Sequence, residues 1–273
     1  MKPFLRWAGG KQNLIKDLLK YLPPEDEVNR YFEPFLGAGS LFFATNYNKC
    51  FLSDINKDLM NCYRFIKTDP NLISENLEIH YTKFQKNEQY YYEVRDQFNE
   101  YLEEKSLKQA VRFLFLIHTS FNGIYRVNLN GKYNVPIGKR KPALPSKDFL
   151  NQISIKLKGN FLATRSFSAI LKMTLKNDFI YLDPPYPPIN GTSFFQHYTK
   201  DKFPQKDQAR VAKFANKLDQ KGCFVMVSNA NTDMIQELYS NWNKYELETT
   251  RYISCKKKRM KVNELIITNY KGD

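Results

Sequence analysis

Five short apolar runs, separated by longer stretches with helical spacing, most constrain what this 273-residue chain can fold into. Runs of this length between helical stretches are typical of buried strands in an α/β sheet. Small, acidic or turn-forming residues follow each of the first four runs, where an open sheet places its ligand crevice. The pattern predicts an α/β fold with strands at residues 31–35, 50–53, 179–182, 224–228 and 264–269, and helices between them, as at 13–21 and 205–220.

Residues 57–146 have a different character from the rest of the chain. They are aromatic and charged, with helical spacing at 90–95 and 110–118. A hairpin-like passage follows at 121–136, where Asn130-Gly131 is a strong signal for a two-residue turn. The sequence therefore predicts a core made of residues 1–56 and 147–273, interrupted by a mainly helical lobe at 57–146 that carries a β-hairpin.

The charge of the chain favours a polyanionic partner. Lys and Arg number 42 against 28 Asp and Glu, a formal net charge of +14. Such a surplus is typical of nucleic-acid binding, although a lysine-rich proteome would also produce it. No apolar run has the length of a membrane-spanning helix, and the N-terminus lacks the apolar stretch of a signal peptide. We expect a cytoplasmic protein without a membrane partner.

The cysteines and histidines argue against a metal site. The four cysteines contain no C-x-x-C pair and have no histidine beside them, which also fits a reduced cytosol. We expect structural or surface roles, and no metal, for Cys50, Cys62, Cys223, Cys255, His80, His118 and His197.

The sharpest chemical signal is the turn Asp183, Pro184, Pro185 and Tyr186, directly after an apolar run. The amino group of an aromatic base is a poor nucleophile, because its lone pair is delocalised into the ring. A carboxylate and a peptide carbonyl that each accept one amino hydrogen would free that lone pair, and Asp183 and Pro184 offer these acceptors. Tyr186 offers a flat face for an extruded base. A proline-rich loop without chemistry is the alternative interpretation.

A glycine turn lies upstream of this motif. Gly37 and Gly39 allow a tight turn and the close approach of backbone to a small molecule, and Ser40 is placed to cap the following helix. Asp54 ends the next predicted strand, where a carboxylate can accept from both hydroxyls of a ribose. A helix cap is the alternative role for Asp54.

Together these motifs resemble the Dam-type (D12 class, alpha group) DNA adenine-N6 methyltransferases, which use S-adenosylmethionine. The glycine loop comes first, then the inserted lobe, then D-P-P-Y. The likeness extends to R-W-A-G-G-K at 6–11, F-N-G-I-Y-R at 121–126 and Y-N-V-P at 133–136. It implies a Rossmann-like sheet with helices on both faces and an inserted DNA target-recognition domain. It also implies methyl transfer to a flipped adenine of double-stranded DNA, with GATC as the expected site.

The resemblance also assigns roles to single residues. The cofactor would contact Trp7, Ala8, Gly9, Lys11, Phe35, Gly37, Gly39, Ser40, Asp54 and Asp183. In the hairpin, Phe121 would wedge into the base stack and Asn122 would contact the orphaned base. Arg126 would read a guanine edge. Apolar base contacts would come from Ile124 and Pro136, and Arg6 stands where the family often has a guanine-contacting Lys.

Three further basic or mobile-loop features extend the predicted DNA contacts. Lys139 and Arg140 follow the hairpin, and Lys256, Lys257 and Lys258 form a second basic run, which is either a solvated loop or a phosphate contact. The loop at 187–203 is expected to act as a flap over the flipped base.

Three alternatives remain open at this point. A related enzyme could modify cytosine N4, RNA or a protein glutamine, although such enzymes more often carry Ser or Asn in place of Asp183. A catalytically inactive DNA-binding homologue and a nuclease are the others. We expect a bacterial or phage-encoded enzyme at the nucleoid, and a separately acting restriction endonuclease is a candidate partner.

Overall fold

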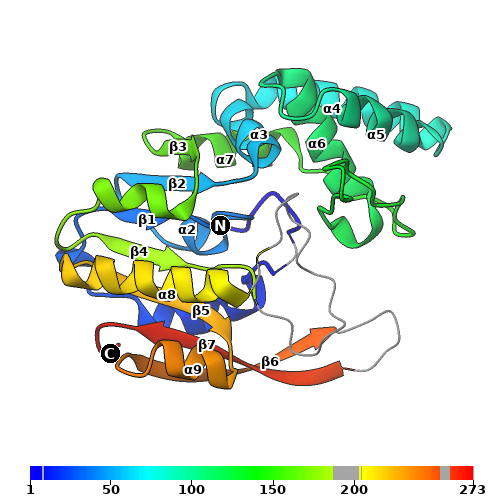
Figure 1. Ribbon diagram of the computed structural model, residues 1–273. Coiled ribbons are helices and arrows are strands. Elements are labelled where there is room, and N and C mark those ends of the chain that lie inside the picture. The colour runs from blue at the N-terminus through cyan, green and yellow to red at the C-terminus, as the bar shows by residue number, and fades with distance from the viewer. Residues whose placement is uncertain (8, 187–202, 204, 253–258, 273) are drawn as a thin grey trace.

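The computed structural model describes residues 1–7, 9–186, 203, 205–252 and 259–272. Within them, one seven-stranded sheet has the order β3-β2-β1-β4-β5-β7-β6 (Figure 1). Neighbours from β3 to β5 pair in parallel, and β7 runs antiparallel to both β5 and β6. The strands are β1 Tyr31–Glu33, β2 Cys50–Asp54, β3 Phe161–Thr164, β4 Phe179–Leu182, β5 Phe224–Ala230, β6 Asn243–Tyr252 and β7 Arg259–Thr268.

The α-helices lie between these strands and in the lobe. The helix predicted at 13–21 is instead a short α-helix flanked by two single 3₁₀ turns, Gln12–Leu14 and Leu19–Tyr21. The α-helices of the described residues are α1 Ile15–Leu18, α2 Ser40–Ala44, α3 Lys57–Thr68, α4 Pro70–Lys86, α5 Tyr90–Glu100, α6 Leu107–Thr119, α7 Lys147–Leu157, α8 Gln205–Gln220 and α9 Asp233–Leu238.

Both faces of the sheet are buried, because successive side chains of each central strand enter different hydrophobic clusters. In β4, Phe179 and Tyr181 pack in the cluster that contains α2, α3 and α6, whereas Ile180 and Leu182 pack with α8 and α9. This alternation is the period of a strand whose two faces are both covered by helices. The predicted α/β fold with helices on both faces is confirmed.

The helices that follow the two central strands β1 and β4 lie on opposite faces of the sheet. After β1, the helix α2 packs into one hydrophobic cluster; after β4, the helix α8 packs into the other, although β1 and β4 are hydrogen-bonded neighbours. A crevice forms outside the carboxyl ends of strands at such a topological switch point. The loops that begin at Pro34 and at Asp183 therefore start side by side.

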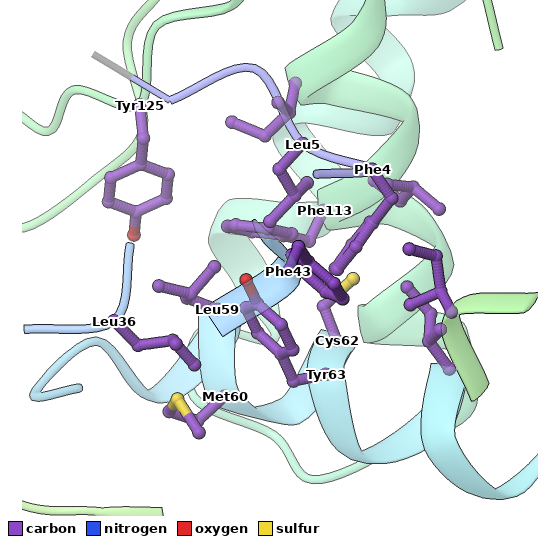
Figure 2. Packing of buried hydrophobic residues seen from close by; sticks show 14 of the residues in the cluster. Phe4, Leu5, Leu36, Phe43, Leu59, Met60, Cys62, Tyr63, Phe113 and Tyr125 are labelled. Atoms are coloured by element: carbon purple, nitrogen blue, oxygen red, sulfur yellow. The ribbon is translucent and has the colours of Figure 1, made fainter. Parts of the chain in front are cut away.

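The lobe rises from the sheet on α3 and consists of α4, α5, α6 and the hairpin (Figure 1). Its core continues into that of the sheet. Figure 2 shows Phe4 and Phe43 beside Tyr63 of α3 and Phe113 of α6, and the Phe4 ring lies 5.0 Å from the Tyr63 ring. The boundaries at 57 and 146 stay a prediction.

The predicted hairpin is a short antiparallel pairing at the edge of the lobe. Val127 pairs with Tyr133, and Ser120 pairs with Ile137. The turn is closed by Asn128, whose carbonyl accepts from the Gly131 N–H at 2.9 Å. The Asn128 side chain also accepts from the N–H groups of Asn130 and Lys132. The predicted two-residue turn is wrong in length: the Asn128 N–H donates to the Lys132 carbonyl, which leaves three residues in the loop, and of Asn130 and Gly131 only Gly131 is left-handed, with a φ of 76°.

Candidate active site

The carboxylate of Asp183 is held at the carboxyl end of β4 by two donors on one oxygen. Lys11 Nζ lies 2.8 Å from Oδ1, and Ser228 Oγ donates to the same Oδ1 at 2.7 Å. No described residue donates to Oδ2, and the Asp183 side chain is 19% exposed. Burial raises the pKa of Asp183, and the Lys11 and Ser228 contacts oppose that rise. Lys11 and Asp183, two of the predicted cofactor contacts, are thus brought together.

The rest of the turn is fixed from other elements. Tyr186 donates its hydroxyl to Oε2 of Glu264 on β7 at 2.8 Å, and the Lys11 ammonium lies 4.4 Å from the centroid of the Tyr186 ring. Gln208 of α8 donates to the Pro185 carbonyl at 2.7 Å. Two hydrogen bonds and a cation–π contact therefore set the ring and the backbone of this turn.

The glycine loop after β1 needs its glycines. Gly37 and Gly39 have φ values of 46° and 66°, in the region that L side chains rarely adopt. A Cβ on Gly37 would lie 2.8 Å from Cδ1 of Trp7, so the indole packs directly on the loop backbone. The Gly37 N–H donates to Oδ2 of Asp54 at 3.0 Å, which joins the loop to the end of β2.

The expected capping role of Ser40 is wrong. The N-cap of α2 is Gly39, and Ser40 is already the first helical residue. A capping side chain must belong to the non-helical residue at the start of the helix, which here has none. The Ser40 Oγ is buried and has no hydrogen-bond partner among the described residues. The N-cap of α3 is Asn56, so the alternative that made Asp54 a helix cap is also wrong.

The remaining predicted cofactor contacts belong to the N-terminal segment and to the loop after β1. Gly9 has a φ of 80° and accepts from the Lys11 ammonium through its carbonyl at 2.9 Å. Phe35 stacks on Phe167 with the ring centroids 5.1 Å apart. Ala8 lies outside the described residues.

The predicted DNA contacts of the hairpin differ in solvent exposure from the residues that pack it against the lobe. Tyr125 and Val127 are buried, whereas Asn122, Arg126 and Pro136 are exposed. Phe121 and Ile124 are half-buried. Asn122 has a φ of 56°, a left-handed conformation that Asn tolerates.

The basic candidates near the hairpin are exposed as well. Arg126 Nε donates to Oδ1 of Asn134 at 2.9 Å, which orients its guanidinium. Arg6 packs its aliphatic stem on Gly123, where a Cβ would lie 2.8 Å from the Arg6 Cβ. Lys139 and Arg140 are exposed. The predicted phosphate contacts Lys256, Lys257 and Lys258 and the predicted flap, apart from residue 203, lie outside the described residues.

The sequence reasoning missed four residues that contact the 183–186 turn or its immediate partners, namely Gln208, Ser228, Asn229 and Glu264. One signal was available. The apolar run of β5 ends in two polar residues, Ser228 and Asn229, that stay within the strand and are fully buried. Buried polar side chains at the end of a central strand need partners, and those partners indicate a site.

The described residues can be compared with the membrane and metal predictions. None of their helices is long and apolar enough to cross a membrane. They contain no cluster of three or more His, Cys, Asp or Glu side chains arranged to hold a metal ion.

Comparison with known proteins identifies the family. Residues 7–253 match the D12 class N6 adenine-specific DNA methyltransferases. A type II methyltransferase of Lactococcus lactis subsp. cremoris is 37% identical, over 99% of this chain and 96% of the relative. One of Methanocaldococcus jannaschii is 38% identical, over 99% of both chains. The DNA adenine methylase of Escherichia coli K12 is 32% identical, over 97% of this chain and 94% of the relative. The chain therefore belongs to the D12 class of N6 adenine-specific DNA methyltransferases.

Proposed function

We propose that this chain transfers the methyl group of S-adenosylmethionine to N6 of an adenine flipped out of double-stranded DNA, at the sequence GATC. The observation that carries the proposal is the asymmetric binding of the Asp183 carboxylate. Both donors among the described residues use Oδ1, so Oδ2 keeps its lone pairs for an amino group, next to the backbone of Pro184. An N6-directed reaction also fits the family, which is adenine-specific.

The residues present fit the cofactor. The Asp54 carboxylate stands at the end of β2, the position that holds a ribose in doubly wound folds. There is no space for a side chain between Gly37 and the indole of Trp7, so the glycine-loop backbone and a flat ring border the proposed cofactor site. The buried Ser40 Oγ lacks a partner among the described residues and can bond a polar group of the ligand.

Bound S-adenosylmethionine supplies an electrophilic methyl group on a sulfonium. The protein's part is to orient the nucleophile. Asp183 Oδ2 accepts one N6 hydrogen and the Pro184 carbonyl accepts the other, which moves the nitrogen towards tetrahedral geometry and frees its lone pair. The Lys11 ammonium covers one face of the Tyr186 ring, and the flipped base stacks on the opposite face.

No side chain has to act as a strong base. The proton leaves after methylation, when the nitrogen has become acidic, and no covalent intermediate with the protein forms. Most of the rate acceleration then comes from positioning and from fixed acceptors that need no reorganisation. The ionised form of Asp183 is required, and the Lys11 ammonium 2.8 Å away stabilises that form.

The exposed face of the hairpin supports the DNA part of the proposal. Asn122, Arg126 and Pro136 are all exposed, and the half-buried Phe121, whose N–H donates to the Pro136 carbonyl at 2.9 Å, is the proposed wedge. Asn134 accepts from Arg126 Nε at 2.9 Å and from Nη2 at 3.4 Å, which leaves Nη1 and the second N–H of Nη2 for a bidentate contact to guanine. GATC, the cytoplasmic nucleoid location and a cognate restriction endonuclease are proposals that rest on the family resemblance.

The experiment is to express the chain in a methylation-deficient host and to sequence the DNA with modified-base detection. N6-methyladenine confined to GATC is expected. Asp183→Ala should abolish the signal and weaken cofactor binding, while the variant still folds and binds duplex DNA. Methylation at another motif would overturn the site assignment alone. Near-normal turnover by Asp183→Ala would overturn the mechanism.

A further inference from the structure

Two neighbouring polar residues of β5, Ser228 and Asn229, are both fully buried in the centre of the molecule. Successive side chains of a strand point to opposite faces of the sheet. Ser228 accordingly meets Tyr181 of β4 on one side, whereas Asn229 meets Gln208 of α8 on the other. Both connections end on the 183–186 turn, so one dipeptide reaches the proposed catalytic turn from two faces.

The first connection ends on the carboxylate. Ser228 Oγ lies 2.7 Å from Oδ1 of Asp183, and Tyr181 Oη lies 3.0 Å from Ser228 Oγ. A serine hydroxyl has one hydrogen, and an ionised carboxylate can only accept. Ser228 therefore donates to Asp183, and Tyr181 donates to Ser228. Burial raises the pKa of Tyr181 well above its ordinary value, so the phenol keeps the proton that it donates.

The second connection ends on the backbone. Asn229 Nδ2 donates to Oε1 of Gln208 at 2.9 Å, and Gln208 Nε2 donates to the Pro185 carbonyl at 2.7 Å. Asn229 thus fixes which end of the Gln208 amide faces the turn. The bond to Pro185 restrains the peptide group next to that of Pro184, whose carbonyl is the second proposed acceptor of the amino group.

We propose that Ser228 and Asn229 are positioning residues for methyl transfer: Ser228, backed by Tyr181, holds the Asp183 carboxylate, and Asn229, through Gln208, holds the backbone of the same turn. The proposal rests on the function proposed above. Neither residue touches the base. Their effect is to keep the Asp183 carboxylate and the Pro184 carbonyl at a fixed separation, because Ser228 and Asn229 both lie on the central strand β5.

The hydroxyl chain has a role that Lys11 does not duplicate. Lys11 lies in the N-terminal segment, outside the sheet, whereas Ser228 is part of a strand paired to β4 residue by residue. Ser228 therefore fixes the carboxylate relative to the strand that carries it. Because both donors choose Oδ1, the orientation of the carboxylate also decides that Oδ2 meets the amino group.

Ser228→Ala and Tyr181→Phe test the first connection. A hydrogen bond to a charged group contributes about 1.5–3 kcal/mol, so Ser228→Ala should lower kcat by about ten-fold to a hundred-fold. Tyr181→Phe should lower kcat less, because its effect passes through Ser228. The KM for DNA should stay the same in both variants. Ser228→Thr keeps the hydroxyl and should recover most of the loss.

The pH profile separates positioning from simple packing. Loss of the Ser228 donor disfavours ionised Asp183, which raises its pKa and moves the acid limb of the kcat profile to higher pH. Besides Ser228 and Tyr181, the groups that face Asp183 are Lys11, Glu264, Tyr186 and Glu33, and the variants leave these four unchanged.

Gln208→Met tests the second connection. It should lower kcat by about two-fold to ten-fold without moving the acid limb, because the lost bond joins neutral groups and no donor to Asp183 is lost. The losses from Gln208→Met and Ser228→Ala should multiply, whereas those from Ser228→Ala and Tyr181→Phe should not, since these two share one chain.

Two controls are matched for burial or chemistry. Tyr239→Phe removes a buried phenol that has no hydrogen-bond partner among the described residues, and Ser154→Ala removes a hydroxyl of α7 bonded to the Lys67 carbonyl. Both should keep wild-type kcat.

Folding of Ser228→Ala is judged by its thermal midpoint. If the folded variant has a kcat within about two-fold of wild type, or if the acid limb of its pH profile does not move, the proposal is overturned. If Ser228→Ala does not fold, Tyr181→Phe decides: wild-type kcat overturns the Ser228 role, and reduced kcat with a shifted limb supports it. A wild-type protein that makes no N6-methyladenine contradicts the proposed function instead.

Discussion

Glu33, the last residue of β1, should make the stability of this protein depend on pH in an unusual direction. Its side chain is only 2% exposed, and its Oε2 accepts from the Tyr31 hydroxyl at 2.7 Å and from the Phe42 N–H at 3.2 Å. Burial raises the pKa of Glu33 to about 8, and the nearby charge of Asp183 adds to the rise, although the two hydrogen bonds oppose it. At neutral pH the folded protein therefore keeps Glu33 protonated.

The magnitude follows from the two pKa values. The folded state binds the Glu33 proton more tightly than the unfolded chain, whose carboxyl titrates near 4.5. The stabilisation from this proton is complete below pH 4.5 and is lost as pH rises towards 8. At about 1.4 kcal/mol for each pH unit, the loss amounts to about 5 kcal/mol.

Glu33→Gln removes the titration while keeping the shape of the side chain. Relative to wild type, the variant should gain about 1.4 kcal/mol of unfolding free energy for each pH unit above 4.5, and the gain should level off near pH 8. Urea unfolding between about pH 5 and about pH 9 measures this difference, with exposed Glu25→Gln as the control. Parallel stability curves for wild type and Glu33→Gln would show that the buried carboxyl does not hold its proton.

Four further predictions concern the cofactor loop and the hairpin. Phe121→Ala should reduce the fluorescence rise of 2-aminopurine at the target position more than it reduces duplex binding; an unchanged signal would make Phe121 a packing residue. Gly37→Ala should weaken cofactor binding at least about ten-fold in a titration, because the new Cβ meets the Trp7 indole at a strained φ, and unaltered affinity would contradict this contact. Arg126→Ala should cut discrimination between GATC and sites altered at the guanine by about 1–3 kcal/mol, measured as a ratio of kcat/KM values. Asn134→Ala should produce a smaller loss of discrimination, because Asn134 orients the Arg126 guanidinium. If Arg126→Ala lowers kcat/KM equally on both substrates, Arg126 does not read a base.

The sequence predicted the strands that are buried on both faces and missed those at the edges. The apolar runs correspond to β1, β2, β4, β5 and β7, which lie inside the sheet. The two missed strands, β3 and β6, are the first and last in the sheet order. An edge strand needs fewer apolar residues: Phe161 of β3 is 59% exposed, and β6 reads N-K-Y-E-L-E-T-T-R-Y. The criterion of a continuous apolar run selects for burial, and the edges of a sheet do not meet it.

The same reasoning explains which parts of the site were visible in the sequence. Asp183 directly follows β4, Asp54 ends β2 and Gly37 lies in the loop after β1, so their position depends on local sequence alone. Ser228 and Glu264 reach the turn from β5 and β7, and their contacts to Asp183 and Tyr186 span 45 and 78 residues. Those contacts depend on which strands are neighbours, and the antiparallel return of β7 beside β5 has no local signature. The groups proposed to perform the chemistry are thus found from motifs, whereas the groups proposed to orient them require the strand order.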